Sequence, residues 1–320
     1  MTHIFVNAPF SDHLIEKIQG VSREITVEPY RLVDGEWPED FTTEAEIIYT
    51  NSMVPSAEKS PNLRWVQSHW ASIRDLRQRP IWELDTILTS ASGVNATNIA
   101  QYVFTKILLF ASQTNNQKSG LPIELLGKKI GIVGYGSVGR EIARVAKTFG
   151  MDVLASKRNL RKTAENGFRL EGTGDPEGVL PLRLYPGEAT RSMISECDFV
   201  VLSVPLTSKT EDLFNDNMLN AMKPTSYLIN ISRGRVFNEP DLVQALSKGW
   251  IAGAALDGFS QEVLGKDSAL RQMDSVVITD NAAGQTAAYN ERVVDLFCEN
   301  VRRYLVGEPL LNLVNREHGY

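Results

Sequence analysis

The 320-residue chain contains little cysteine, only Cys197 and Cys298, which lie far apart in sequence and lack a metal-ligand spacing. This excludes a disulfide framework, predicts no metal site and indicates a reducing compartment, the cytoplasm by default. No apolar run is long enough to cross a bilayer, and no secretory leader pattern opens the chain, so we expect no membrane partner. The formal net charge of −6 provides no basic surface for nucleic acid.

What the chain does have is a globular composition, with 42% hydrophobic and 22% charged residues, and enough length for two domains. Short strand-like runs alternate with helical segments along the whole sequence, which is typical of parallel α/β folds. A largely apolar helix expected at 95–110 and an amphipathic helix expected at 289–306 are the candidate crossings between the two domains.

The strongest single motif is a glycine-rich turn between an apolar run and a helical segment. It reads Gly134-x-Gly136-x-x-Gly139, in which the glycines allow a tight turn, a close backbone approach and helix–strand packing. The free N–H groups at the start of the helix, at Ser137 and Val138, attract phosphate. A purely structural turn is the alternative, but both flanks and a following strand favour a dinucleotide site.

Basic residues stand where an NAD site usually has an acid. Lys157 and Arg158 follow a second strand, in the range of about 20 residues beyond the glycines at which a carboxylate would accept the ribose 2′-OH. Cations there would attract a 2′-phosphate, and a guanidinium can bind it in a forked way. We therefore expect NADP(H) to be preferred over NAD(H), with a solvated charge cluster as the alternative.

Further candidate residues follow other strands. Arg233, Asp257 and Asn281 each come at or just after a strand end, where ligands sit in open α/β sheets. The loop of His69, Trp70, Ala71 and Ser72 follows a strand in the N-terminal region, and its backbone N–H groups could hold a carboxylate. An ordinary loop with a packed Trp70 is equally compatible with the sequence.

Residues 160–190 are rich in glycine and proline, and we expect them to form a long irregular excursion, either a lid or an oligomer arm.

At this point the sequence resembles the D-isomer-specific 2-hydroxyacid dehydrogenase family. The resemblance covers nearly the whole chain in one order. The matching segments are Val133–Gly139, Val204–Thr207, Asn230–Gly234, Ala255–Asp257 with Phe259 and Glu262, Ile278–Thr279 with Ala283–Gly284, Trp70–Ser72 and Glu299–Tyr304.

The resemblance implies two doubly wound parallel-sheet domains with the active site in the cleft. Residues 1–95 plus 286–320 would form the smaller, flavodoxin-like substrate domain, and residues 96–285 the Rossmann dinucleotide-binding domain. It also implies NAD(P)-linked interconversion of a small 2-oxo acid and its D-2-hydroxy acid, by a homodimer.

The resemblance also assigns residue roles. Arg233 would hold the carboxylate and carbonyl of the substrate, Asp257 would face the nicotinamide carboxamide, and Glu262 would orient a catalytic histidine. The Trp70–Ser72 loop would offer backbone N–H groups to the carboxylate, although a glycine is usual where Ser72 stands. Further cofactor contacts would come from Val204, Pro205, Thr207, Ile231, Ser232 and Gly284. For Arg233, a surface arginine in a turn is the alternative.

One departure from the family puts its chemistry in doubt. Asn281 stands where the catalytic histidine belongs, and none of the four histidines is near it in sequence. Asparagine donates hydrogen bonds but exchanges no proton near pH 7, so roughly 3–5 kcal/mol of barrier lowering is in question. His69 is a candidate substitute acid, although a packed or solvated histidine is the more frequent state, and Glu262 acting through water is another.

Two functions therefore stay open. The first is NADP-dependent reduction of a small 2-oxo acid with altered chemistry at Asn281. The second is a catalytically impaired NADP(H)-binding sensor or partner protein. Retention of Arg233, Asp257 and Glu262 favours the first.

Overall fold

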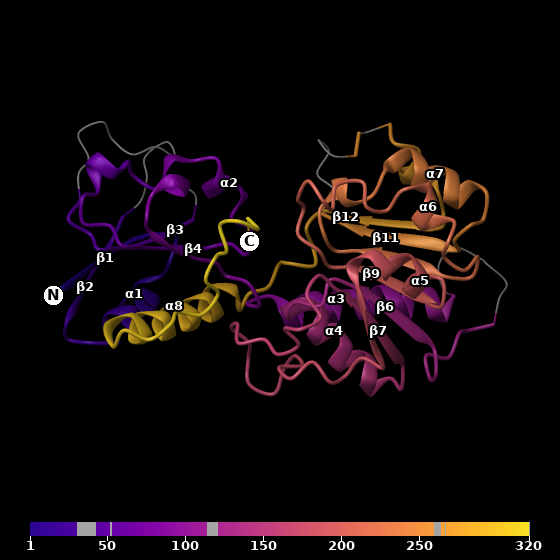
Figure 1. Cartoon of the computed structure of the whole chain (residues 1–320), viewed down its shortest axis with the longest axis horizontal. Coiled ribbons are helices and arrows are strands. Elements are labelled where there is room, and N and C mark those ends of the chain that lie inside the picture. The colour runs from indigo at the N-terminus through magenta and orange to yellow at the C-terminus, as the bar shows by residue number, and fades with distance from the viewer. Residues whose placement is uncertain (31–42, 52, 114–120, 259–263, 266, 320) are drawn as a thin grey trace. The chain divides into compact units, whose positions relative to one another are not determined.

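The computed structural model describes residues 1–30, 43–51, 53–113, 121–258, 264–265 and 267–319. The chain forms two compact units (Figure 1). The terminal unit combines Met1–Val94 with Ala287–Tyr320, and the central unit is Asn95–Thr286.

The terminal unit is built on a five-stranded sheet of order β2-β1-β3-β4-β5, in which all recorded pairs are parallel. This order is that of flavodoxin-like folds, as the family resemblance implies. The strands are β1 (Thr2–Asn7), β2 (Ile25–Pro29), β3 (Ile47–Thr50), β4 (Trp65–Ser68) and β5 (Ile87–Thr89). The helical elements are α1 (Asp12–Gln19), η1 (Ala57–Lys59), α2 (Arg74–Arg77), η2 (Pro80–Glu83) and α8 (Tyr289–Leu305).

The C-terminal helix belongs to this N-terminal sheet. Helix α8 lies beside α1 (Figure 1) and buries an apolar face. Its Phe297 packs against Tyr49 of β3 and Trp65 of the neighbouring β4, with ring centroids 5.0 and 5.3 Å apart. Both ends of the chain are therefore needed to complete one core.

The central unit holds a seven-stranded sheet of order β12-β11-β10-β9-β6-β7-β8, again with parallel pairs throughout the described strands. The strands are β6 (Lys129–Val133), β7 (Asp152–Lys157), β8 (Arg183–Pro186), β9 (Phe199–Leu202), β10 (Tyr227–Asn230), β11 (Gly253–Asp257) and β12 (Val276–Thr279). The order reverses between β6 and β9, and ligands of doubly wound sheets bind at such a switch point.

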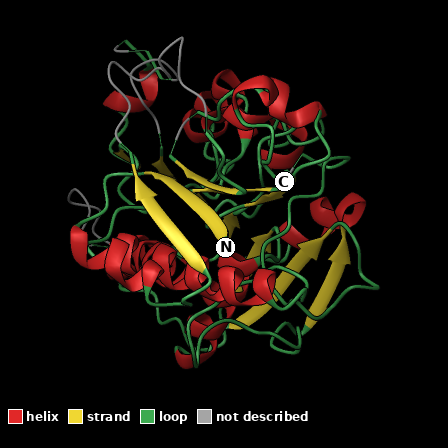
Figure 2. Ribbon diagram, turned by 90° about the vertical axis from the view of Figure 1, so that its left-hand side faces the viewer, coloured by secondary structure: helices red, strands yellow, loops and turns green. Residues whose placement is uncertain are grey.

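Helices flank the strands of this sheet (Figure 2). They are α3 (Ala96–Ser112), α4 (Ser137–Thr148), α5 (Thr190–Ile194), α6 (Asp216–Leu219) and α7 (Glu239–Ser247), with short η3 (Gly187–Ala189), η4 (Gly234–Val236) and η5 (Ala269–Gln272). Successive residues of β9 enter different cores: Phe199 and Val201 join the cluster of α3 and α4, and Val200 and Leu202 join that of α7. Cores on both faces make this unit a doubly wound α/β fold, as predicted.

The prediction of an irregular excursion over 160–190 is wrong in its second half. Residues 183–186 form the edge strand β8 beside β7, and η3 and α5 follow directly. Pro186 hides this strand in the sequence, but proline is tolerated at a sheet edge, where an N–H needs no partner. Residues 160–182 contain no helix or strand, as predicted.

Candidate functional site

The glycine turn has the geometry that its sequence predicts. Gly134 has a φ of 98°, and a Cβ there would collide with the Ser203 carbonyl. A Cβ on Gly139 would collide with the Gly134 carbonyl, which is the close helix–strand packing expected of the third glycine. A Cβ on Gly136 would meet nothing within 4 Å, so the backbone is open to a ligand there.

The turn lies at the switch point of the central sheet. It joins β6 to α4, and the first N–H groups of that helix have no partner within the helix. The positive end of the helix dipole lies at these N–H groups and favours a phosphate. The residues present therefore fit a dinucleotide: an open backbone at Gly136 and donors at Ser137 and Val138.

The neighbouring strand ends are tied together by a serine. Ser232, at the end of β10, is buried, and its hydroxyl accepts from the Val204 N–H at 2.9 Å. The Ile231 N–H donates to Leu202 of β9. Beyond Val204, Thr207 and Thr210 hold the loop after Pro205 through a 2.8 Å bond from the Thr207 N–H to the Thr210 hydroxyl. These contacts place the predicted cofactor residues along one rim.

Lys157 is the last residue of β7, and Arg158 follows it. Strand β7 pairs with β6, the strand that leads into the glycine turn. Lys157 is half-buried, and burial lowers the pKa of its ammonium, with a smaller contribution from Arg140. Arg158 is exposed. An ammonium without a full hydration shell gains more from a phosphate partner than a surface lysine does.

Asp257 is buried at the end of β11, and its carboxylate supports the following loop. One oxygen accepts from the Thr279 hydroxyl at 2.7 Å and the Ala282 N–H at 2.8 Å. The other accepts from the Ala283 N–H at 3.0 Å. Asp257 thus shapes the loop that carries Asn281, in addition to the contact with the nicotinamide that the resemblance implies.

Asn281 is exposed at the tip of this loop, with a φ of 48°. Asparagine and histidine both tolerate this left-handed region better than most residues. Its Oδ1 faces the end of β11, since a Cβ built on Gly258 would lie 3.1 Å from that atom. The position is therefore open to a ligand and sterically suited to a histidine.

Arg233 follows β10 and caps η4, and its side chain is exposed. Its carbonyl accepts from the Val236 N–H, but its guanidinium forms no hydrogen bond or ion pair with any residue that the structure describes and is available to an anion. Arg235, two residues on, is paired with Glu211. Glu262 lies outside the described residues, as does Phe259.

In the terminal unit, His69 is packed rather than solvated. It is 3% exposed, its Nδ1 shares a 2.7 Å hydrogen bond with the Tyr49 hydroxyl, and its carbonyl accepts from the Tyr289 hydroxyl. Burial lowers the pKa of the imidazole to about 4. The ring is neutral near pH 7, which disfavours the charged form that a proton donor needs.

The loop after His69 leaves donors available. Trp70 stacks on Tyr289, and its indole N–H donates to the Asn51 carbonyl at 2.8 Å. The backbone N–H groups of Ala71 and Ser72 donate to no residue within the described ranges, and both residues are exposed. The loop can therefore receive a carboxylate.

The state of His69 predicts a pH dependence of stability. The unfolded imidazole has a pKa of about 6.5, so between pH 6.5 and 4 the unfolded chain binds a proton that the folded chain excludes. The free energy of unfolding should fall by up to about 3 kcal/mol as the pH drops through this window. Urea unfolding at several pH values measures it. His69→Gln should flatten the dependence, whereas the exposed His13→Gln should not; equal slopes for all three proteins would contradict this assignment.

Sequence reasoning missed three residues that hold the Asn281 loop. They are Asn95, the N-cap of α3, and Asn98 and Tyr102 within the helix, at the spacing i, i+3 and i+7. Asn95 donates to the Gly284 carbonyl at 2.9 Å, Asn98 to the Ala283 carbonyl at 2.7 Å, and the Tyr102 hydroxyl contacts that of Thr279. The helical spacing of polar residues in an apolar helix was the available signal.

Two negative observations apply to the described residues. They contain no group of three histidine, cysteine or acidic side chains that could hold a metal ion. None of their helices is sufficiently long and apolar to traverse a lipid bilayer.

Comparison with known proteins identifies the family. Residues 102–283 match the family model of the D-isomer specific 2-hydroxyacid dehydrogenase, NAD binding domain. The chain belongs to this family. The match spans most of the central unit, whose sheet order and glycine turn are those of a dinucleotide-binding domain.

Its relatives include glyoxylate reductases. That of Pyrococcus furiosus is 39% identical over 197 residues, which are 62% of this chain and 54% of that protein. The chain thus spans about half the length of such a relative. The glyoxylate reductase of Korarchaeum cryptofilum is 30% identical over 275 residues, 81% of this chain and 78% of that protein.

Solved structures extend the likeness over the whole chain. A D-isomer specific 2-hydroxyacid dehydrogenase from Xanthobacter autotrophicus, in complex with NADPH and MES, has a TM-score of 0.78 and 26% identity, with full coverage of both chains. An NADPH-dependent glyoxylate/hydroxypyruvate reductase from Sinorhizobium meliloti, with NADP and sulfate, has the same fold, with a TM-score of 0.77, 22% identity and full coverage of both chains.

Proposed function

We propose that the protein is an NADP-dependent oxidoreductase that reduces a small 2-oxo acid to the D-2-hydroxy acid. The observation that carries this proposal is the set of groups at the carboxyl ends of the strands of the central sheet. There an open glycine turn, a half-buried lysine, an unpaired arginine and the Asp257-supported loop follow neighbouring strands. The glyoxylate reductases among the relatives support a small 2-oxo acid as substrate.

The central unit, including the proposed domain 96–285, would bind the cofactor. The pyrophosphate would meet the N–H groups of Ser137 and Val138, and the 2′-phosphate would meet Lys157 and Arg158. When bound, the cofactor supplies the hydride for the carbonyl carbon. The remaining proposed contacts, near the ribose and the nicotinamide, come from Val204, Pro205, Thr207, Ile231, Ser232, Asp257 and Gly284.

The substrate's carboxylate requires cations and N–H donors. The Arg233 guanidinium presents two parallel N–H groups, which can span the carboxylate and the neighbouring carbonyl oxygen. The Trp70–Ser72 loop, in the proposed substrate domain of residues 1–95 and 286–320, offers the free N–H groups of Ala71 and Ser72. Arg233 thus polarises the carbonyl and favours the charge that develops on its oxygen.

Proton donation to the carbonyl oxygen is the weak step of this mechanism. Asn281 can donate a hydrogen bond to the carbonyl oxygen from its amide but keeps its proton. His69 is neutral and buried, so we give it a positioning role through Tyr49 and Tyr289 instead of the proton-donor role considered above. Glu262 acting through water is the remaining proposed proton source. The lack of a proton donor at Asn281 also supports the second candidate, an NADP(H)-binding sensor or partner protein with impaired catalysis.

The cofactor assignment is tested at Lys157. Calorimetric titration at equal ionic strength should show tighter binding of NADPH than of NADH. Lys157→Asp should reverse the order, because a carboxylate repels a 2′-phosphate and accepts a ribose hydroxyl. Lys248→Asp, an exposed change just after α7, is the control and should keep the order. Equal affinities for the two cofactors in the wild-type protein would refute the preference.

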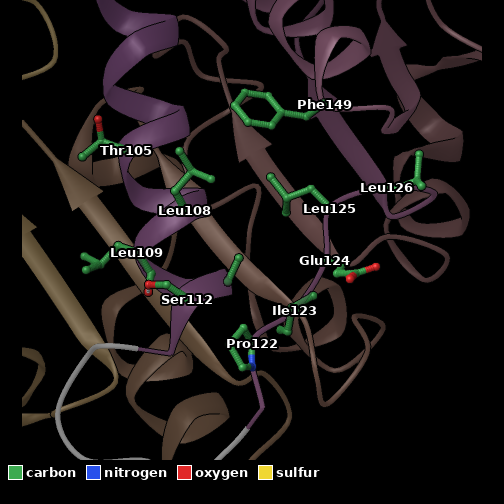
Figure 3. Close-up of a pocket in the computed structure, with 11 residues that line it drawn as sticks. Thr105, Leu108, Leu109, Ser112, Pro122, Ile123, Glu124, Leu125, Leu126 and Phe149 are labelled. Atoms are coloured by element: carbon green, nitrogen blue, oxygen red, sulfur yellow. Dashed lines mark hydrogen bonds between the residues drawn. The ribbon is translucent and has the colours of Figure 1, made fainter.

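We also propose a cytoplasmic homodimer. Two free, buried cysteines suit a reducing compartment. The central unit carries an apolar groove lined by residues of α3, by the segment 122–126 and by Phe149 (Figure 3). Leu108, Leu126 and Phe149 line it and are 39–76% exposed, which is unusual for large apolar side chains and typical of a subunit interface.

A further inference from the structure

The segment 160–182 is fastened to the cofactor turn by a buried arginine. Arg140, in the first turns of α4, is 2% exposed. Its guanidinium donates to the carbonyls of Asp175 and Thr163 and lies over the Tyr135 ring, 4.9 Å from the centroid. A buried cation is costly unless a nearby anion compensates it.

Glu165 supplies that anion. Its Oε2 lies 2.6 Å from Arg140 Nε, though out of line with the N–H direction, so the contact is an ion pair without a well-formed hydrogen bond. The carboxylate of Asp175 is already occupied by the Tyr135 hydroxyl and by two backbone N–H groups. Within the described residues, Glu165 alone forms an ion pair with Arg140.

The second oxygen of Glu165 reaches the cofactor turn itself. Glu165 Oε1 accepts a 3.0 Å hydrogen bond from the hydroxyl of Ser137, the first residue of α4. A carboxylate of the protein therefore lies at the helix end where the pyrophosphate would bind. Two anions cannot share this end without strong repulsion.

We infer that Glu165 is a resident anion that competes with the cofactor's pyrophosphate for the N-terminus of α4 and so sets dinucleotide affinity. This inference rests on the proposed function. Binding of a dinucleotide displaces the Glu165 carboxylate from Ser137, and segment 160–182 loosens at that point. Arg140 stays anchored by Asp175 and Thr163. The pyrophosphate is common to both cofactors, so Glu165 weakens the binding of NADPH and of NADH. Lys157, in contrast, acts on the 2′-phosphate alone.

The test is Glu165→Gln, which keeps the size and hydrogen bonds of the side chain and removes its charge. Fluorescence titration should show dissociation constants for NADPH and NADH that both fall about tenfold at low salt, and by less at high salt. Glu171→Gln, an exposed change in the same segment, is the matched control and should leave both constants unchanged.

The outcomes separate this inference from the proposed function. A wild-type protein that binds neither dinucleotide refutes the proposed function, and the inference still stands if Glu165→Gln then binds both. Unchanged or weaker binding by Glu165→Gln overturns the inference, and so does a gain confined to NADPH. The wild-type ratio of NADPH to NADH affinity bears only on Lys157.

A second measurement needs no variant. The Glu165 N–H donates to the Pro176 carbonyl at 3.0 Å. Hydrogen exchange of this amide should become faster when the wild-type protein is saturated with NADPH, because displacement of the Glu165 side chain weakens the hydrogen bond between Glu165 and Pro176. Slower or unchanged exchange would overturn the inference even where Glu165→Gln fails to fold.

Discussion

Asn281→His is expected to raise the rate of 2-oxo acid reduction by about 10²-fold or more, with little change in the affinity for NADPH. The φ of 48° at this position suits a histidine, so the loop on Asp257 should keep its shape. An imidazole beside a carboxylate has a raised pKa and a defined orientation, which suits a proton donor near neutral pH. Steady-state assays with glyoxylate, hydroxypyruvate and pyruvate measure the gain.

Two controls separate proton donation from a change of shape. Asn281→Asp also tolerates a positive φ but carries no donor near pH 7, so it should bring no gain. Adding Glu262→Gln to Asn281→His should remove much of the gain. A wild-type protein that already turns over at an ordinary dehydrogenase rate, and that Asn281→His slows, would show that the proton comes from elsewhere.

Arg233→Ala should weaken the binding of a 2-oxo acid analogue by about 30-fold or more, since the loss of a charged partner in a desolvated contact costs about 2–5 kcal/mol. The guanidinium forms no hydrogen bond or ion pair with another described residue, and the side chain is exposed, so its removal should leave the fold intact. Oxamate and oxalate protection of the NADPH complex against thermal unfolding is the measurement. The affinity for NADPH itself should stay constant.

Arg235 provides the matched control. It is an exposed arginine two residues along the same turn, paired with Glu211, and Arg235→Ala should keep the protection. Arg233→Lys should give an intermediate loss, because it keeps the charge and lacks the planar fork. Protection that persists in Arg233→Ala would mean that another group holds the carboxylate.

Much of the fold could be predicted because it depends on local signals. The alternation of strand-like and helical segments along the chain predicts the parallel α/β class that both sheets have. The strand β8 was missed because four residues at a sheet edge, next to a proline, carry too weak a signal.

The candidate site also contains residues whose role could be predicted from the sequence and residues whose environment could not. The roles of Gly134, Gly136 and Gly139 follow from the absence of a side chain, which is visible in the sequence and has the expected geometric consequence. The environment of a polar side chain is not local. His69 could be solvated or packed as far as its neighbours in sequence show, and only its burial against Tyr49 and Tyr289 makes the ring neutral.

The sequence by itself determined the parallel α/β class, the dinucleotide turn, the basic strand end at Lys157 and the departure at Asn281. Each depends on residue type and on spacing within one or two elements. Only the tertiary structure decided that Asp257 supports the Asn281 loop and that Glu165 pairs with Arg140 at the start of α4. These contacts join residues 25 or more positions apart, and their energies depend on burial and on atomic distances, which spacing along the chain does not specify.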